Sequence, residues 1–288
     1  MKMRIVAVIS AVCICALMAV GQSSKRRPSP SPSPTPDMWE DYEGVKFQKG
    51  PSVGELGVNA QVSVPDGYIF ADAKDTRTIM EANRNPISNR ELGFVAASDD
   101  TWFVVFEFDS VGYVKDDEKD SLDADAILAS IRTATEESNK ERVKRGWPPM
   151  TVLGWEQKPH YDEVTHNLEW AVRAQSDGEP VVNYNTRLLG RGGVMEVTLV
   201  TDPSSLPATL PKFKSMLSGF DFKQGHRYAE FRAGDKTAAY GLTGLIVGGG
   251  TAVLVKSGAF KWIWKALVAA GIAVAALVKK IFSRNRDA

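Results

Sequence analysis

The sequence predicts an α+β fold, an antiparallel sheet meander flanked by helices, with an N-terminal signal peptide and a C-terminal transmembrane anchor. Three observations support this prediction. Residues 151–200 hold several apolar runs separated by short turns, which is typical of consecutive antiparallel strands. Segments with helical spacing precede and follow this region. Both ends of the chain are apolar, whereas residues 38–237 between them have the length of an ordinary exported domain.

The first half of this domain mixes strands and helices. Val58–Val64 alternates like a strand, and Trp102–Phe108 is so continuously apolar that we expect a central strand. Lys74–Ala82 has helical spacing. A longer helix with an apolar stripe follows, and either Asp120 or Ser121 is expected to cap its start.

The second half of the domain is predicted to be a run of strands closed by a helix. Short turns between the strands favour a meander over parallel crossovers. A last helix and a short strand are expected after it. The expected elements, in chain order, are the strands Thr151–Trp155, Tyr161–Thr165, Leu168–Ala174, Val181–Leu189 and Val194–Val200, the helix Leu206–Leu217 and the strand Phe220–Phe222.

The N-terminus has the pattern of a secretory signal peptide. A basic start precedes an apolar stretch from Ile5 to Val20, which is short for a membrane span. Small residues predict cleavage after Gly21, so residues 1–21 are the signal; an uncleaved signal anchor is the alternative. Cleavage would remove both cysteines, and the mature chain could then hold neither disulfides nor zinc–thiolate sites.

Residues 22–37 are a linker rich in proline and serine. The alternating prolines from Pro28 to Pro36 exclude helix and sheet pairing and favour polyproline II. We therefore expect a stiff spacer between the signal and the domain.

Residues 238–288 are predicted to be a membrane anchor with a basic tail. Trp262–Phe282 is long enough to cross a bilayer, with tryptophans at one end and lysines at the other. The glycine-rich Ala238–Val255 leaves alternatives open, because it could be the first span of a hairpin, pack on the domain or lie at the interface. A signal and an anchor together predict a domain on the periplasmic or extracytoplasmic side of a bacterial inner membrane.

The charges are distributed unevenly although the formal net charge is zero. Outside the signal and the tail there are 26 of the 35 basic residues and 34 of the 35 acidic residues, a balance of 26 − 34 = −8. Nucleic-acid binding depends on basic side chains that neutralise phosphates. The acidic domain therefore argues against a nucleic-acid partner.

His160, Asp162 and His166 could form a site for a metal or for general-base chemistry. On a straight strand, however, these residues would be spread over about 20 Å. No motif of a metalloprotease, zinc site or nucleophile elbow accompanies them. Surface histidines without a catalytic role are the alternative interpretation.

The acidic segment Lys115–Asp120 could hold calcium, but it lacks the order of ligands in an EF-hand loop. A solvated turn ahead of an acid-capped helix is the alternative interpretation.

Strand alternation predicts that Asn183, Asn185 and Arg187 share one face of the sheet. Amide and guanidinium groups on one face are suited to binding sugars or carboxylates. We take these three residues as a candidate binding face; a strand with one wetted face is the alternative.

Several motifs spaced along the chain resemble a known family. They are Gly112–Asp117, Gly154–Trp155, Pro159–Asp162, Thr165–Ala171, Asn183–Arg187, Leu189–Arg191 and Gly225–Ala229. Together they resemble an uncharacterised bacterial family of membrane-anchored proteins of unknown function, sometimes labelled predicted regulators of an amylopullulanase. The resemblance runs from about Gly50 to the tail and implies an envelope location and a C-terminal anchor. It supplies no established activity, and the proline-rich linker is not part of the family pattern.

The sequence thus predicts a non-enzymatic, membrane-tethered envelope domain that binds an unknown envelope protein or glycan. The C-terminal tail would contact the lipid bilayer, and no cofactor is predicted. The alternative is a hydrolase or metal-dependent enzyme that uses His160, Asp162 and His166. A third possibility is a structural bilayer component that assembles through Gly244 and Gly248.

Overall fold

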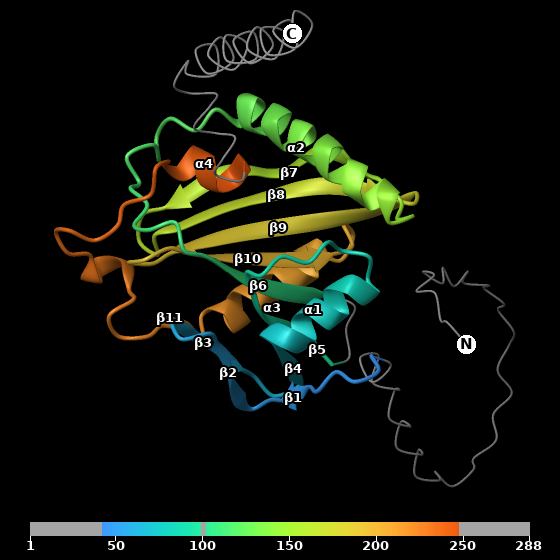
Figure 1. Cartoon of the computed structure of the whole chain (residues 1–288), viewed down its shortest axis with the longest axis horizontal. Coiled ribbons are helices and arrows are strands. Elements are labelled where there is room, and N and C mark those ends of the chain that lie inside the picture. Colours follow the sequence, from blue (N-terminus) through green and yellow to red (C-terminus); the bar gives the residue numbers. More distant parts are fainter. Residues whose placement is uncertain (1–41, 99–101, 248–288) are drawn as a thin grey trace, which may run out of the picture. The chain divides into compact units, whose positions relative to one another are not determined.

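The computed structural model describes residues 42–98 and 102–247, and these residues form an α+β fold built on antiparallel strands, as the sequence predicts (Figure 1). The α-helices are α1 (Ala73–Ala82), α2 (Ala124–Lys144), α3 (Leu206–Leu217) and α4 (Leu242–Val247). The strands are β1 (Gln48–Lys49), β2 (Ser52–Leu56), β3 (Ala60–Val64), β4 (Tyr68–Asp72), β5 (Glu91–Ala97), β6 (Phe103–Asp109), β7 (Met150–Asp162), β8 (Asn167–Ser176), β9 (Glu179–Leu189), β10 (Val194–Thr201) and β11 (Phe220–Phe222).

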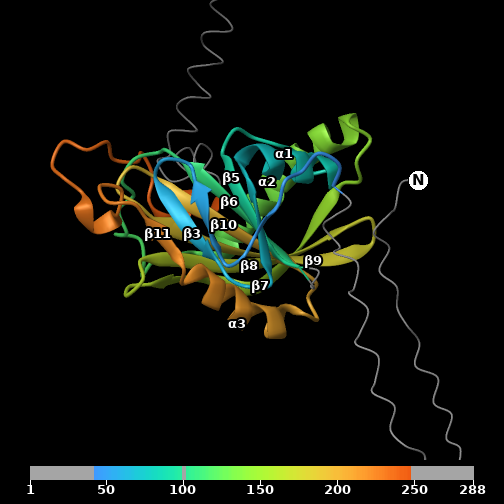
Figure 2. The same ribbon diagram turned by 90° about the horizontal axis from the view of Figure 1, so that it is seen from below.

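The larger sheet has eight strands in the order β1-β4-β5-β6-β10-β9-β8-β7. Its last four members, β7 to β10, are the predicted meander, and each pairs antiparallel with the next in the chain. The apolar strand β6 lies near the centre between β5 and β10, as its composition predicts. Helices α1 and α2 lie on one face of this sheet and α3 on the other (Figures 1 and 2). We call these the helical face and the α3 face.

A second sheet of three strands, in the order β11-β3-β2, helps to cover the α3 face. Sequence patterns identified β11 as strand-like, but they did not reveal that it pairs with β3, more than a hundred residues earlier. Such long-range pairing leaves no local signal in the sequence.

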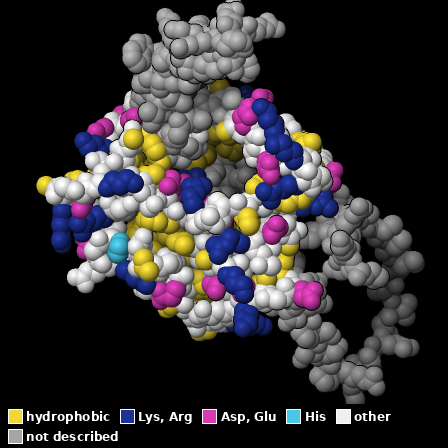
Figure 3. Space-filling view, in the orientation of Figure 1, with side chains coloured by type: hydrophobic (Ala, Val, Ile, Leu, Met, Phe, Trp, Pro, Cys, Tyr) yellow, Lys and Arg dark blue, Asp and Glu magenta, His cyan; other side chains and the backbone are white. Residues whose placement is uncertain are grey.

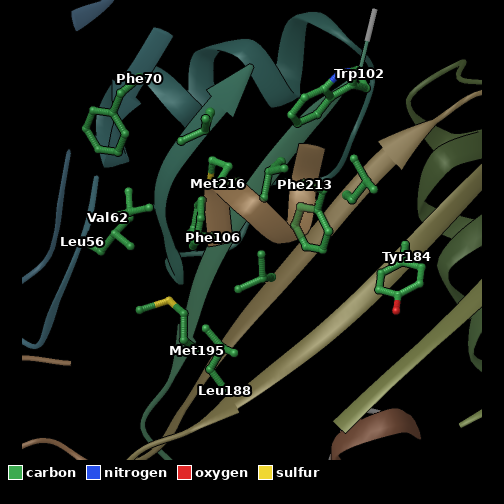
Figure 4. Close-up of a cluster of buried hydrophobic side chains, with 14 of the residues drawn as sticks. Leu56, Val62, Phe70, Trp102, Phe106, Tyr184, Leu188, Met195, Phe213 and Met216 are labelled. Atoms are coloured by element: carbon green, nitrogen blue, oxygen red, sulfur yellow. The ribbon is translucent and has the colours of Figure 1, made fainter. Parts of the chain in front are cut away.

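The α3 face holds the main hydrophobic core (Figure 4). Phe213 and Met216 of α3 pack with Phe106 and Tyr184 of the large sheet and with Trp102 just before β6, and all five side chains are buried. Burial of large apolar and aromatic side chains is the main favourable contribution to folding. This face therefore accounts for much of the stability of the domain.

The helical face has two separate apolar clusters instead of one. Ile79 of α1 packs with Phe94 and neighbouring side chains at one side of the sheet. Ile127 of α2 and Leu245 of α4 pack over β8 at the other side. Between these clusters, β9 and β10 carry polar side chains on this face along most of their length, with Leu189 and Val194 at one end joining the cluster under α2.

Strand β7 differs from the prediction, because Thr151–Trp155 and Tyr161–Thr165 are not separate strands. The structure has one strand of 13 residues with three register shifts against β8. The polar residues in its middle concealed its continuity. Helix α2 lies along it: Arg132 Nη2 donates to the Leu153 carbonyl oxygen at 3.3 Å, and Asn139 bonds the main chain of Met150 through both amide atoms at 2.8 Å.

Helix α2 starts later than expected. Asp123 is its N-cap, and the carboxylate accepts hydrogen bonds from the main-chain amides of Asp125 and Ala126. Asp120 and Ser121 lie before this cap, so the prediction that one of them caps the helix is wrong. The run of acidic residues before the helix offered several equivalent caps.

The start of the glycine-rich segment packs on the domain. Leu242–Val247 forms α4, and Leu242, Leu245 and Ile246 join the apolar cluster under α2. Within residues 42–98 and 102–247, no helix is both long and apolar enough to span a bilayer. The predicted signal peptide, the linker and Trp262–Phe282 lie outside the described residues, and those assignments stay predictions.

Candidate functional site

Strand β9 directs Asn183, Asn185 and Arg187 to the helical face, as the alternation of the sequence predicts. Tyr184 between them enters the core of the α3 face. The three candidate residues lie between the apolar cluster under α1 and the one under α2. Figure 3 shows this face with basic and acidic side chains interspersed among hydrophobic ones.

Arg187 is the most unusual of the three, because only 7% of it is exposed. Its Nη2 lies 3.3 Å from Oε2 of Glu196, and its guanidinium lies 4.7 Å from the ring centroid of Trp170. Its Nε and Nη1 are buried and have no hydrogen-bond partner. Burial lowers the pKa of Arg187, opposed by Glu196, yet an arginine stays charged in proteins. Unpaired donors of a buried cation are costly.

Cross-strand pairing places a row of charges beside Arg187. Arg187 pairs with Glu196 on β10, Glu196 with Glu107 on β6, and Glu107 with Glu91 on β5. Like charges directly opposite each other on a sheet are destabilising. Arg90 offsets this repulsion: it lies 3.1 Å from Glu196 and 3.7 Å from Glu107. Burial raises the pKa of Glu107, opposed by Arg90.

The roles of Glu107, Glu196 and Arg90 were not predicted from the sequence. The usable signal for the two glutamates was an acidic residue between apolar ones, Glu107 between Phe106 and Phe108 and Glu196 between Met195 and Val197. Their convergence on Arg187 depends on the pairing of β6 with β10, which no local pattern encodes.

The two amides lie further along β9 and are half-buried. Nδ2 of Asn185 donates to the carbonyl oxygen of Asn183 at 3.0 Å, and Oγ1 of Thr198 donates to Oδ1 of Asn185 at 3.3 Å. The side chain of Asn183 bonds to no residue in the described part of the chain. We call Asn183, Asn185, Arg187, Glu107, Glu196 and Thr198 together the polar stripe. It offers donors and acceptors to a bound polar group, and nothing in it is arranged as a nucleophile with a base.

His160, Asp162 and His166 lie around the end of β7 and the turn that follows. His160 is exposed, and Oδ1 of Asp162 accepts hydrogen bonds from the main-chain amides of Val164 and Thr165 within that turn. These bonds lower the pKa of Asp162. Across residues 42–98 and 102–247, no group of three His, Cys, Asp or Glu side chains is placed to hold a metal ion.

His166 instead joins a stack of aromatic rings. Its ring lies 5.1 Å from that of Tyr228, which stacks on Tyr113 at 4.5 Å, and Phe231 lies 4.2 Å from Tyr113 on the same stack. Nδ1 of His166 lies 3.1 Å from the hydroxyl of Tyr161. The stack joins three segments that are far apart in the sequence. The role of His166 in it is structural.

The acidic segment Lys115–Asp120 is also tied into the fold. Asp116 accepts a hydrogen bond from the Tyr161 hydroxyl at 2.9 Å, and Glu118 accepts one from the main chain at Thr243 in α4 at 3.0 Å. These carboxylates hold neighbouring segments together and do not converge on one point.

Comparison with known proteins yields a family without an assigned activity. The model of a family described as "Protein of unknown function (DUF2167)" matches residues 48–279. No curated protein matches the chain.

Solved structures show only distant likenesses. The chain is similar to cyanobacterial PsbP (CyanoP) from Synechocystis sp. PCC 6803, with 11% identity, a TM-score of 0.36 and coverage of 62% of this chain and 92% of that one. It is similar to the Ran-binding protein Mog1p of Saccharomyces cerevisiae, with 11% identity, a TM-score of 0.35 and coverage of 65% and 98%. At such low similarity, neither likeness bears on function.

Proposed function

The chain belongs to the DUF2167 family of proteins of unknown function, and from that premise we propose that it is a membrane-tethered envelope domain that binds a protein or glycan partner through the polar stripe. The observation that carries this proposal is the polar character of the central strands on the helical face. A sheet face whose only role was to stabilise the fold would carry apolar side chains packed under helices.

The burial of Arg187 supports the same proposal. Two buried nitrogens of its guanidinium have no hydrogen-bond partner, and leaving them unpaired costs free energy because their lost hydration is not replaced. Groups that cost stability are characteristic of functional sites. Asn183, four residues earlier on the same strand, has no bond from its side chain to a described residue and is free to contact a partner.

The tether is the second part of the proposal. The family match extends to residue 279, so the apolar segment Trp262–Phe282 lies almost entirely within the region that the family model matches. We place the domain on the extracytoplasmic side of a bacterial inner membrane, with the C-terminal tail in the bilayer. If the regulatory label attached to the resembling family applies, the partner is an enzyme that acts on a glucan.

Site-specific photo-crosslinking tests the partner. A crosslinker at Asn183 in whole cells should capture one discrete envelope partner, and an Asn185→Ala change should reduce that product about tenfold. A crosslinker at Asn59, a half-buried amide in the turn between β2 and β3, is the matched control. Equal capture at both positions would refute the polar stripe as the binding face.

Protease protection tests the tether separately. With intact cells, an external protease should remove an epitope placed after residue 37 once the outer envelope is opened. Protection of that epitope until the inner membrane is dissolved would refute the proposed topology.

A further inference from the structure

A groove beside α2 lies outside the polar stripe. Its volume is about 380 Å³, which is near the lower end of the range for small-molecule sites, roughly 300–1,000 Å³. Apolar side chains form most of its wall, among them Pro86, Ile131, Met150 and Ile246. They come from the loop after α1, from α2, from the start of β7 and from the end of α4.

Arg142 is the only charged residue among the described residues that line this groove. It is only 6% exposed. Its Nε donates to the carbonyl oxygen of Pro148 at 2.8 Å and its Nη1 to that of Arg84 at 3.1 Å. Both acceptors are neutral, and no carboxylate in the described part of the chain pairs with Arg142.

This environment differs from that of the other buried arginine. Arg187 has Glu196 as an ion-pair partner, whereas burial alone lowers the pKa of Arg142. A buried charge without a counter-ion is expensive, and arginine cannot escape the cost by losing its proton. The groove therefore contains a positive charge that an anion would neutralise.

The guanidinium also has hydrogen-bonding capacity left. Of its five N–H donors, two are used by Pro148 and Arg84, so 5 − 2 = 3 remain, on Nη1 and Nη2. Donors on these two nitrogens form the fork that binds a carboxylate through both oxygens. Ser138 and Asn85 also line the groove, and their side chains bond to no residue that the structure describes.

We propose that this groove binds a small amphiphile, an apolar chain ending in a carboxylate such as a fatty acid, with the carboxylate at Arg142 and the chain against Ile131, Met150 and Ile246. A carboxylate fits better than a phosphate monoester, because one guanidinium neutralises one charge. The apolar wall gives the chain a surface to bury. This site is independent of the proposed function of the polar stripe.

Equilibrium dialysis with labelled octanoate tests the proposal on the full-length chain in phosphatidylcholine nanodiscs, with empty nanodiscs subtracted. Saturable binding of one octanoate per chain is expected. Unlabelled octanoate should displace the label, whereas octylamine should not, because its charge has the same sign as that of Arg142. Uptake that does not exceed that of empty nanodiscs, or equal displacement by octylamine or octanol, would overturn the proposal.

Two variants locate the site. Ala134→Phe fills the groove from an exposed position on α2 and leaves Arg142 and its carbonyl partners in place. Ala129→Phe makes the same change at an exposed position of the same helix outside the groove. Octanoate binding should weaken at least about tenfold in Ala134→Phe and stay unchanged in Ala129→Phe. Equal affinity in the two variants would show that octanoate binds elsewhere.

Arg142→Gln tests the charge directly. Glutamine keeps a donor near the carbonyl oxygens of Pro148 and Arg84, and the affinity for octanoate should fall about tenfold while any affinity for octanol is unchanged. A circular-dichroism melt confirms that the variant is folded. A folded Arg142→Gln protein that binds octanoate as well as the parent does would contradict the role of the guanidinium.

Discussion

The two faces of the large sheet are built from the same strands, but they differ in composition. On the α3 face, β6, β9 and β10 contribute side chains to one continuous apolar core. On the helical face, the same strands contribute the polar stripe between two separate apolar clusters. The alternation of side chains along a strand makes this division possible, because neighbouring residues belong to different faces. The fold can thus be stabilised by apolar packing on one side while the other side carries polar and charged groups.

Removal of a core side chain on the α3 face should have the largest effect. Phe213→Ala is expected to lower the free energy of unfolding by about 3–5 kcal/mol, because it leaves a cavity in a fully buried cluster. Urea denaturation measures this change. Leu210→Ala on the same helix, which is only partly buried, should cost clearly less; equal losses would mean that the core is not centred on Phe213.

A change at Arg187 should have an intermediate effect. Arg187→Met is expected to cost about 2–3 kcal/mol, because Glu196 and Glu107 lose a nearby cation while they stay largely buried. A second change, Glu196→Gln, should restore at least half of the loss, since it removes one of the opposed carboxylates. If the double variant is less stable than Arg187→Met, Glu196 stabilises the stripe independently of Arg187.

A change at Asn183 should separate binding from stability. Asn183→Val is expected to alter the free energy of unfolding by less than about 0.5 kcal/mol, because the amide bonds to no described residue. Partner capture by a crosslinker at Thr198 should nevertheless fall about tenfold. A loss of stability as large as that of Phe213→Ala would remove the distinction between the two faces.

An effect that depends on pH should appear away from both faces, at Asp235. Two hydrogen bonds from Arg191 lower the pKa of Asp235 to about 2. A carboxyl group whose pKa is lowered by folding adds stability above its unfolded pKa, about 3.9, and that contribution is lost as the pH falls toward 2. The melting temperature of Asp235→Asn should therefore lie below that of the parent at pH 6, and the gap should narrow between pH 5 and pH 2. A gap that does not depend on pH would contradict this origin.

Local patterns predicted much of the fold. The bounds of α3 agree with the prediction at both ends, since a serine and a proline mark its start and its apolar spacing is regular. Strand β7 was divided in two because Lys158 and Pro159 interrupt its apolar pattern, and register shifts absorb them in the structure. Strands β1, β2 and β4 were not predicted as separate elements, because short strands next to turns give weak periodicity.

The candidate site was predicted only in part. Alternation along β9 placed Asn183, Asn185 and Arg187 on one face, which is a property of a single strand. The burial of Arg187 and its ion pair with Glu196 depend on neighbouring strands and so were not predictable. Arg142 was missed for a similar reason: its burial depends on bonds to the carbonyl oxygens of Pro148 and Arg84, which lie outside α2.

Strand β7 has a consequence for self-association. It ends the large sheet, and a long terminal strand with free amides and carbonyls would be a template for pairing with a second molecule. Side chains of α2 already bond to the main chain of β7 at Met150 and Leu153. Three register shifts make the spacing of the remaining amides and carbonyls irregular. Copies of the domain can then meet at this edge without pairing through β7.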